Sequence, residues 1–248
     1  MKGKGLKNTA MLSAASLLFL FAVWGIAYLA IGNEYLLPSP WETVKAAVSL
    51  LGTGGFYVAF FSTLGRAVAA FFLALVFGVG FALVAYLSPA FGAILRIPMA
   101  ILRAMPTMAV LLLILVGVSP AIAPIVIGGM TLFPLLYTAT HSALLAVDQE
   151  LLEMCDVYRV PAAVRIRKMY LPYTLPKLLS EGLAALSFAL KLTVSAEVLT
   201  FTYQSVGGWI QESALAVETP TMMALTLLVC LLGGVIEMVG ALAFRREI

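Results

Sequence analysis

Residues 60–87 read FFSTLGRAVAAFFLALVFGVGFALVAYL, an apolar run whose only charged residue is Arg66. As a helix, this run is longer than the roughly 20 residues that cross the hydrocarbon core of a bilayer. The rest of the 248-residue chain has the same character, since 62% of it is hydrophobic and 11% is charged. Soluble domains are about half apolar and about a quarter charged. The sequence therefore predicts an integral membrane protein.

Five further stretches are long and apolar enough to cross a membrane. Lipid offers no partners to backbone polar groups, so each stretch must be a helix, and we predict an all-α integral membrane protein with six transmembrane helices. The N-terminal stretch, residues 9–31, follows three lysines, as the apolar segment of a signal peptide follows its basic residues. It is too long for such a segment, and we interpret it as a retained span. We expect residues 1–248 to form one transmembrane domain. The six predicted spans are residues 9–31, 60–87, 97–118, 121–145, 178–201 and 222–244.

Basic residues are distributed unevenly between the two sides of this predicted bundle. Cytoplasmic loops of membrane proteins carry an excess of Lys and Arg. If the N-terminus is cytoplasmic, the opposite side holds little basic charge beyond Lys45, against Glu34, Glu42, Glu212 and Glu218. We therefore expect both termini in the cytoplasm. The basic residues on that side would be Lys2, Lys4, Lys7, Arg96, Arg159, Arg165, Arg167, Lys168, Lys177, Arg245 and Arg246.

A short helix is predicted between the first two spans. Ser39 has the residue type of an N-cap, and Pro40 suits the first helical position. The helix should end near Leu51, before Gly52, and it is too short to span. We expect it at the outer membrane interface, with Trp41 at headgroup depth.

Small residues recur at four-residue spacing in the second span, at Ala70, Ala74, Gly78 and Ala82. Such a stripe lets a second helix approach closely. The second helix could belong to the same chain or to another subunit, and intramolecular packing is the favoured alternative.

Residues 148–172 carry the densest charge in the chain, between the fourth and fifth spans. Asp148 is a candidate N-cap of a short helix with acidic residues in its first turn. Val160 precedes Pro161 and is therefore biased away from helical geometry, so we expect a turn there. A second short helix should follow and end near Leu171 and Pro172. The segment is thus predicted to be a cytoplasmic helix-turn-helix.

This segment resembles the coupling segment of binding-protein-dependent ABC transporter permeases. The family motif is E-A-A, three residues, G, nine residues, I, one residue, L-P. Glu153 matches its Glu, and Leu171 and Pro172 match its Leu-Pro, whereas Arg159 replaces the Gly that usually makes the turn. Pro161 offers another way to turn the chain.

Shorter matches follow in the order of the nitrate/sulfonate/taurine group of these permeases, and the resemblance covers residues 37–248. They are LPSP at 37–40, S-x-x-x-R at 62–66, R-x-x-P from Arg103 to Pro106, AE at 196–197 and GGW at 207–209.

The resemblance implies a type I ABC importer permease in a bacterial-type cytoplasmic membrane. Two permease copies would form the pathway, two ATPase subunits would bind ATP and Mg²⁺, and an extracytoplasmic solute-binding protein would deliver the solute. No cofactor on this chain and no nucleic-acid partner is expected. The residues implied in coupling to the ATPase are Glu153, Asp156, Val157, Tyr158, Arg159, Pro161, Leu171 and Pro172.

Ionisable residues inside spans are costly and therefore suggest functional sites. Lys191 is the deepest basic candidate: it could meet an anionic solute, or it could pair with Glu197, Glu181 or Glu237 to pin helices together. The candidate translocation-pathway residues are Arg103, Pro106, Lys191, Ser195 and Glu197.

Two other function classes compete with an importer. A secondary transporter would need no ATPase and would be expected to show inverted repeats, which the sequence lacks. A membrane-embedded enzyme would need a motif such as HExxH or GxSxG, and neither is present. His141 is the only histidine, and Cys155 and Cys230 form no motif, so no catalytic or metal-binding residue is assigned. The solute is left open among nitrate, sulfonates, taurine and thiamine-precursor pyrimidines.

Overall fold

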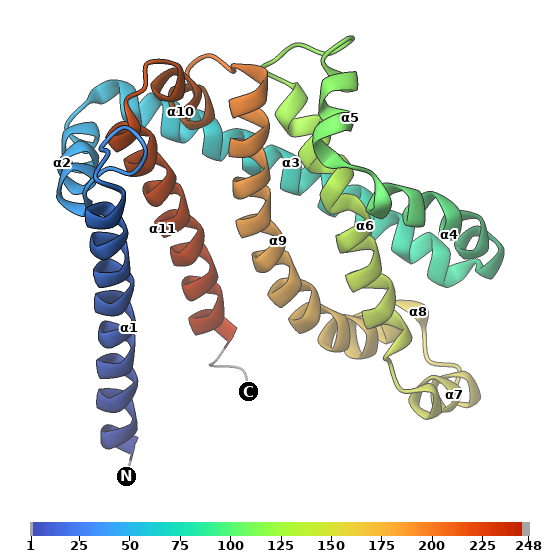
Figure 1. The fold of residues 1–248 in the computed structure, drawn as a ribbon. Coiled ribbons are helices and arrows are strands. Elements are labelled where there is room, and N and C mark those ends of the chain that lie inside the picture. The colour runs from blue at the N-terminus through green and yellow to red at the C-terminus, as the bar shows by residue number, and fades with distance from the viewer. Residues whose placement is uncertain (1, 245–248) are drawn as a thin grey trace.

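The computed structural model describes residues 2–244, and every regular element in this range is helical. This confirms the predicted all-α fold (Figure 1). The side chains of Lys2, Lys4 and Lys7 and the whole of Arg245 and Arg246 lie outside the description. The elements are α1 (Lys2–Ile31), α2 (Pro40–Leu51), α3 (Gly54–Leu87), α4 (Pro89–Ala104), α5 (Thr107–Ile114), α6 (Ala123–Leu145), α7 (Gln149–Val157), α8 (Ala162–Arg165), the π-helical turn η1 (Ile166–Tyr170), α9 (Leu171–Thr200), α10 (Val206–Leu215) and α11 (Thr219–Phe244).

Four helices within residues 2–244 are long and apolar enough to cross a membrane. They are α3, α6, the continuous helix Ala162–Thr200 and the stretch Thr219–Val239 of α11. In α1, the apolar stretch of the searched residues is shorter, Leu18–Ile31. Helices α4 and α5 pass the test only as a pair. The total of six spans stays a prediction.

The third predicted span, residues 97–118, is wrong as a single helix. Helices α4 and α5 meet at an angle of 95°. Between them, Met105 has an extended backbone (ψ 130°) and Pro106 follows it. Proline lacks the N–H that would continue the helical ladder, and it disfavours helical geometry in the residue before it. Hydropathy depends on the apolar character of the residues and not on backbone geometry, so it does not detect such a break.

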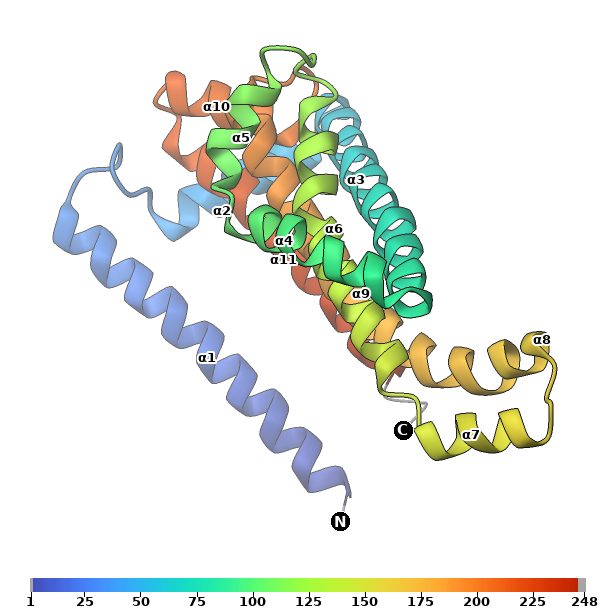
Figure 2. The same ribbon diagram turned by 90° about the vertical axis from the view of Figure 1, so that its right-hand side faces the viewer.

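The core is formed by α3, α6 and α9, with α11 packed on α9. The small-residue stripe of α3 is buried along its length and faces α6. The approach is so close that a Cβ added to Gly128 of α6 would lie 2.8 Å from the Cβ of Ala70. Intramolecular packing, the favoured alternative for this stripe, is therefore what the structure shows. In contrast, α1 stands apart from the bundle (Figure 2) and packs mainly on α2.

Helix α2 has the predicted bounds. The Ser39 hydroxyl accepts a hydrogen bond of 3.1 Å from the backbone N–H of Glu42, Pro40 occupies the first turn, and the helix ends at Leu51. Capping of this kind is local, because the donor and acceptor lie within one helical turn of each other. For that reason the sequence was sufficient to place both ends.

The short helix that was predicted to end near Pro172 is wrong in its length. From Ala162 the chain is helical through η1 into α9 and on to Thr200. The backbone N–H of Leu171 donates to the carbonyl of Ile166, five residues back, so the helix widens just before Pro172. Such a π-turn absorbs a proline without ending the helix.

Candidate functional site

Helices α7 and α8 project from the bundle (Figure 2), at the end of the molecule where α1 begins and α11 ends (Figure 1). Helix α7 starts as predicted, since the Asp148 carboxylate accepts a hydrogen bond of 3.0 Å from the backbone N–H of Glu150. The carboxylate also lies at the positive end of the helix dipole. The segment therefore has the predicted helix-turn-helix shape outside the packed spans.

The chain turns at Arg159, two residues before Pro161, which immediately precedes α8. Arg159 has a left-handed backbone (φ 50°), the conformation that glycine adopts most easily. Its N–H donates to the carbonyl of Asp156 (3.1 Å), and the N–H of Val160 donates to that of Cys155 (2.9 Å). This pair of bonds is a Schellman motif. Arg159 thus occupies the glycine position of the motif, at a cost of about 1–2 kcal/mol.

Arg165 fastens the turn, and sequence reasoning did not assign it a role. Its guanidinium donates to the carbonyls of Val160 and Cys155, each at 2.9 Å, and forms an ion pair with Asp156. Bonds from a charged donor are worth about 1.5–3 kcal/mol each. The sequence alone does not single out Arg165 for this role, because Arg167 and Lys168 lie close to it in the chain.

The remaining coupling candidates give the loop a mixed apolar and acidic exposed surface. The side chains of Val157 and Tyr158 are 78% and 75% exposed, and Glu153 is exposed beside them. Cys155 is buried on the inner side of α7, with its Sγ 3.0 Å from the Sδ of Met169. Pro161, Leu171 and Pro172 are also exposed. Exposed apolar side chains on a projecting segment are typical of an interaction surface.

Two pathway candidates lie at the α4–α5 break. Arg103, in the last turn of α4, donates to the hydroxyl of Thr138 on α6. A cavity of about 340 Å³ opens beside it, lined also by Thr107, Thr131 and Phe188, with Pro106 adjacent in the chain. Within residues 2–244, none of the ion pairs includes Arg103. The hydroxyl of Thr138 is thus the side-chain partner of Arg103 among the described residues, and its guanidinium borders the cavity.

Lys191 and Ser195 lie on one exposed face of α9. The Lys191 ammonium is 3.3 Å from the Glu237 carboxylate of α11, which also accepts a hydrogen bond of 2.7 Å from Ser187. The Ser195 hydroxyl donates to the backbone carbonyl of Lys191. The pairing with Glu237 is one of the alternatives considered for Lys191. Because both charged side chains are about half exposed (53% and 54%), the pair still faces outward from the core.

Glu197 lies in a different environment from the other four pathway candidates. Its side chain is 0% exposed, and it pairs with Arg66 at 2.9 Å. The Thr63 hydroxyl (2.8 Å) and the N–H of Gly207 (3.2 Å) also donate to it. Glu197 therefore joins α3 and α9 to the first turn of α10. Removing one partner of such a buried pair costs about 3–5 kcal/mol, because a bare charge is left behind.

Comparison with known proteins decides the family. Residues 70–246 match the family model described as "Binding-protein-dependent transport system inner membrane component". The chain belongs to this family. It is thus a membrane permease component of the ABC importer type, located in the inner membrane. A search of curated proteins finds no match.

Solved structures of ABC transporters share the permease fold. A methionine ABC transporter in inward-facing conformations has a TM-score of 0.61 and 19% identity, over 76% of this chain and 94% of that one. An amino acid ABC transporter with histidines has a TM-score of 0.63 and 15% identity, over 74% and 90%. A bacterial transporter involved in import of the acidic polysaccharide alginate has a TM-score of 0.68 and 17% identity, over 98% of both chains. At these identities, the likeness establishes the fold.

No group of three His, Cys, Asp or Glu side chains that could hold a metal ion occurs among the residues that the structure describes. The chemically distinctive parts of this permease include the projecting loop, the Arg103 cavity and the charged face of α9.

Proposed function

We propose that this permease works as one transmembrane domain of an ATP-driven importer, with a second permease copy, two ATPase subunits and an extracytoplasmic solute-binding protein. The observation that carries the proposal is the projecting α7–α8 segment, with Glu153, Val157 and Tyr158 exposed around a rigid turn. An element that must transmit force needs such a preorganised contact surface. ATP and Mg²⁺ would be bound by the partner, and both termini would lie with the loop in the cytoplasm.

The solute would pass along Arg103, Pro106, Lys191 and Ser195 as the spans alternate between two states. Glu197 would support this pathway by fixing the position of α10. The Arg103 guanidinium lines a cavity and donates to the hydroxyl of Thr138, which supports a small polar solute with an anionic group. Nitrate, sulfonates and taurine fit that description, and thiamine-precursor pyrimidines are the alternative solutes.

The test is to tag the chain, extract it gently from its native membrane and identify co-purifying proteins by mass spectrometry. We expect an ATPase with a phosphate-binding loop to co-purify with the unmodified chain. Glu153→Arg and Val157→Asp should each abolish its recovery, because they place a wrong or unpaired charge in the contact. Val116→Asp is the matched control, since Val116 is 87% exposed and follows α5 at the opposite end.

A clean chain without ATPase, moving solute in proteoliposomes that lack ATP, would contradict the proposal in favour of a secondary transporter. Equal loss of the ATPase in Val116→Asp would show that the variants act through general damage and not through the loop.

A further inference from the structure

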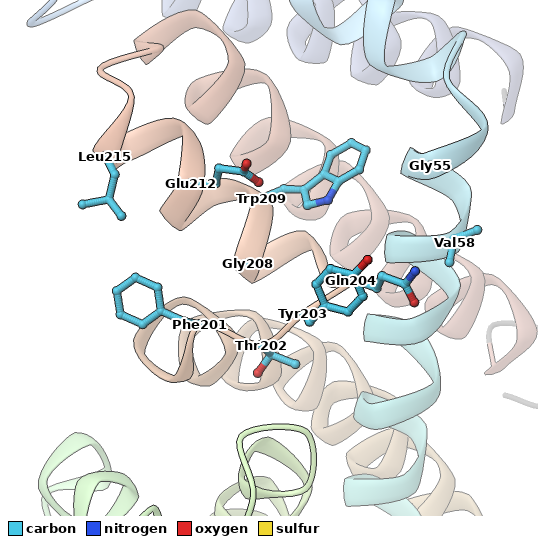
Figure 3. Close-up of a pocket in the computed structure, with 10 residues that line it drawn as sticks. All are labelled: Gly55, Val58, Phe201, Thr202, Tyr203, Gln204, Gly208, Trp209, Glu212 and Leu215. Atoms are coloured by element: carbon cyan, nitrogen blue, oxygen red, sulfur yellow. The ribbon is translucent and has the colours of Figure 1, made fainter.

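A cavity of about 510 Å³ lies at the end of the molecule opposite α7. It opens to the surface and is lined by the start of α3, the segment between α9 and α10, and α10 itself (Figure 3). This volume is sufficient for a small organic molecule. The lining residues are Gly55, Val58, Phe201, Thr202, Tyr203, Gln204, Gly208, Trp209, Glu212 and Leu215.

The lining combines aromatic rings with one carboxylate. Phe201, Tyr203 and Trp209 contribute the rings, Glu212 contributes the charge, and none of the lining residues is basic. Aromatic faces attract cations, and recognition of ammonium groups by aromatic cages relies on this attraction. The chemistry of the cavity therefore favours a cationic nitrogen and disfavours an anion.

The start of α10 offers nothing to an anion either. A free helix N-terminus would attract negative charge, but the first three N–H groups of α10 are already used. Val206 donates to Thr63 (2.9 Å), Gly207 to Glu197 (3.2 Å) and Gly208 to Ser205 (2.8 Å). The Glu197 carboxylate thus satisfies the helix dipole from inside the core.

Residues 201–204 line one side of the cavity with a strained backbone. Phe201 (φ 50°) and Gln204 (φ 48°) both have left-handed backbones. Thr202, between them, donates to the carbonyl of Pro120 at 3.0 Å and shares a hydrogen bond with Thr200. Non-glycine residues in this conformation cluster at ligand-binding sites, where the surrounding structure imposes the strain.

We propose that this cavity binds a cationic nitrogen of the transported solute at the outer end of the pathway, with Glu212 as counter-charge and the Tyr203 and Trp209 rings as walls. This inference rests on the proposed importer function and narrows its solute class. It favours solutes that carry an amine or a protonated amino-heterocycle over simple anions such as nitrate. Arg103, at the α4–α5 break, would then meet a different part of the solute.

The experiment uses Trp209 fluorescence in the full chain, reconstituted in lipid nanodiscs. The chain has three tryptophans, so Trp24→Phe and Trp41→Phe leave Trp209 as the single reporter. Tetramethylammonium is the probe, with sodium at equal concentration as the ionic-strength reference and methanesulfonate as the anionic probe. We expect saturable quenching by tetramethylammonium alone, weakened about tenfold by Glu212→Gln and by Tyr203→Leu.

Two matched variants test whether the effect is local. Glu218→Gln makes the same charge change at a residue that lines the neighbouring cavity but not this one. Tyr35→Leu removes a tyrosine that is 73% exposed and lies outside the cavity. Neither should change the affinity for tetramethylammonium by more than about twofold.

Three results would each overturn the inference. They are no response to tetramethylammonium, a response to methanesulfonate instead, and equal weakening of tetramethylammonium binding by Glu218→Gln. The importer proposal is tested by a separate result, the recovery of an ATPase. A chain that binds tetramethylammonium as expected but recovers no ATPase would retain the cation site and lose the importer function.

Discussion

Arg159 combines an unfavourable backbone conformation with a fixed place in the loop turn. Its left-handed φ of 50° is stabilised from outside, by the Schellman bonds and by the Arg165 guanidinium that binds the adjacent carbonyls. A residue with a Cβ is strained in this conformation, whereas glycine is not. The loop therefore stores strain at the point where the resembling family motif has glycine.

Replacing Arg159 with glycine should stabilise the loop. We expect Arg159→Gly to raise stability by about 1 kcal/mol, because relief of the strain exceeds the extra freedom of the unfolded chain. Thermal unfolding of the purified permease would measure it. Tyr158→Gly is the control: Tyr158 has an ordinary negative φ of −84°, so it should lose stability. Equal destabilisation by both variants would contradict this account of the turn.

Gly207 is required by close packing. An added Cβ would lie 2.4 Å from the Cβ of Glu197 and 2.6 Å from the carbonyl oxygen of Val194, and neither atom can move freely. We expect Gly207→Ala to lower the thermal unfolding midpoint sharply, with a loss of about 1–3 kcal/mol. Gly80→Ala, where nothing lies within 4 Å, should instead be neutral or gain about 1 kcal/mol from helix propensity. A tolerated Gly207→Ala would mean that α10 is not packed in this way.

At the scale of elements, α7 and α8 behave as one unit because Arg165 crosses the turn between them. Its guanidinium reaches two carbonyls and one carboxylate at the end of α7. Without those bonds, α7 would be attached to the bundle mainly through the chain and the contact of Cys155 with Met169. These contacts link α8 to the end of α7 and to the turn that follows it.

We expect Arg165→Gln to increase hydrogen exchange at the α7 amides about tenfold, since the loss of charged hydrogen bonds exceeds 1 kcal/mol. Arg167→Gln removes the same charge from an exposed residue two positions on, and exchange should stay unchanged. The readout is exchange mass spectrometry of α7 peptides in the intact chain. Similar exchange in both variants would indicate that net charge, and not the Arg165 contacts, rigidifies the loop.

At the scale of the whole molecule, the exposed charged face of α9 and the projecting loop are joined by continuous helix. The helix Ala162–Thr200 runs from α8, beside the loop turn, to the buried Glu197 cluster of Thr63, Arg66, Glu197 and Gly207. Lys191 and Ser195 lie on the exposed face of this same helix. If the permease works as proposed, a movement of the loop would reach this charged face through the same helix.

If the permease works as proposed, Arg103→Met should lower ATP-dependent solute uptake by about tenfold or more, because the cavity loses its only cationic wall residue. Arg96→Met, in the same helix but exposed and outside that cavity, is the control. Uptake would be measured in proteoliposomes with the recovered ATPase, alongside ATPase recovery itself. Unchanged uptake in Arg103→Met, with normal ATPase recovery, would remove Arg103 from the pathway.

The sequence by itself determined the local features of this protein. Hydropathy located four helices that are long and apolar enough to cross a membrane, because apolar length is a property of each stretch alone. Ser39 and Asp148 placed the starts of α2 and α7, because an N-cap bonds within its own turn. The charged loop and its resemblance to the permease motif were also visible in the sequence, because both lie within one short stretch, residues 148–172.

Tertiary structure alone decided which distant residues meet. Thr63 and Arg66 reach Glu197 from 134 and 131 residues away, and the sequence gives no sign of that pairing. It also decided the 95° angle at Pro106, since a proline permits a bend without setting its size. The left-handed turn at Arg159 is accompanied by hydrogen bonds from Arg165 to the carbonyls of Val160 and Cys155, which the sequence did not reveal. Local patterns record backbone preferences, whereas pairing and bending depend on how the helices pack together.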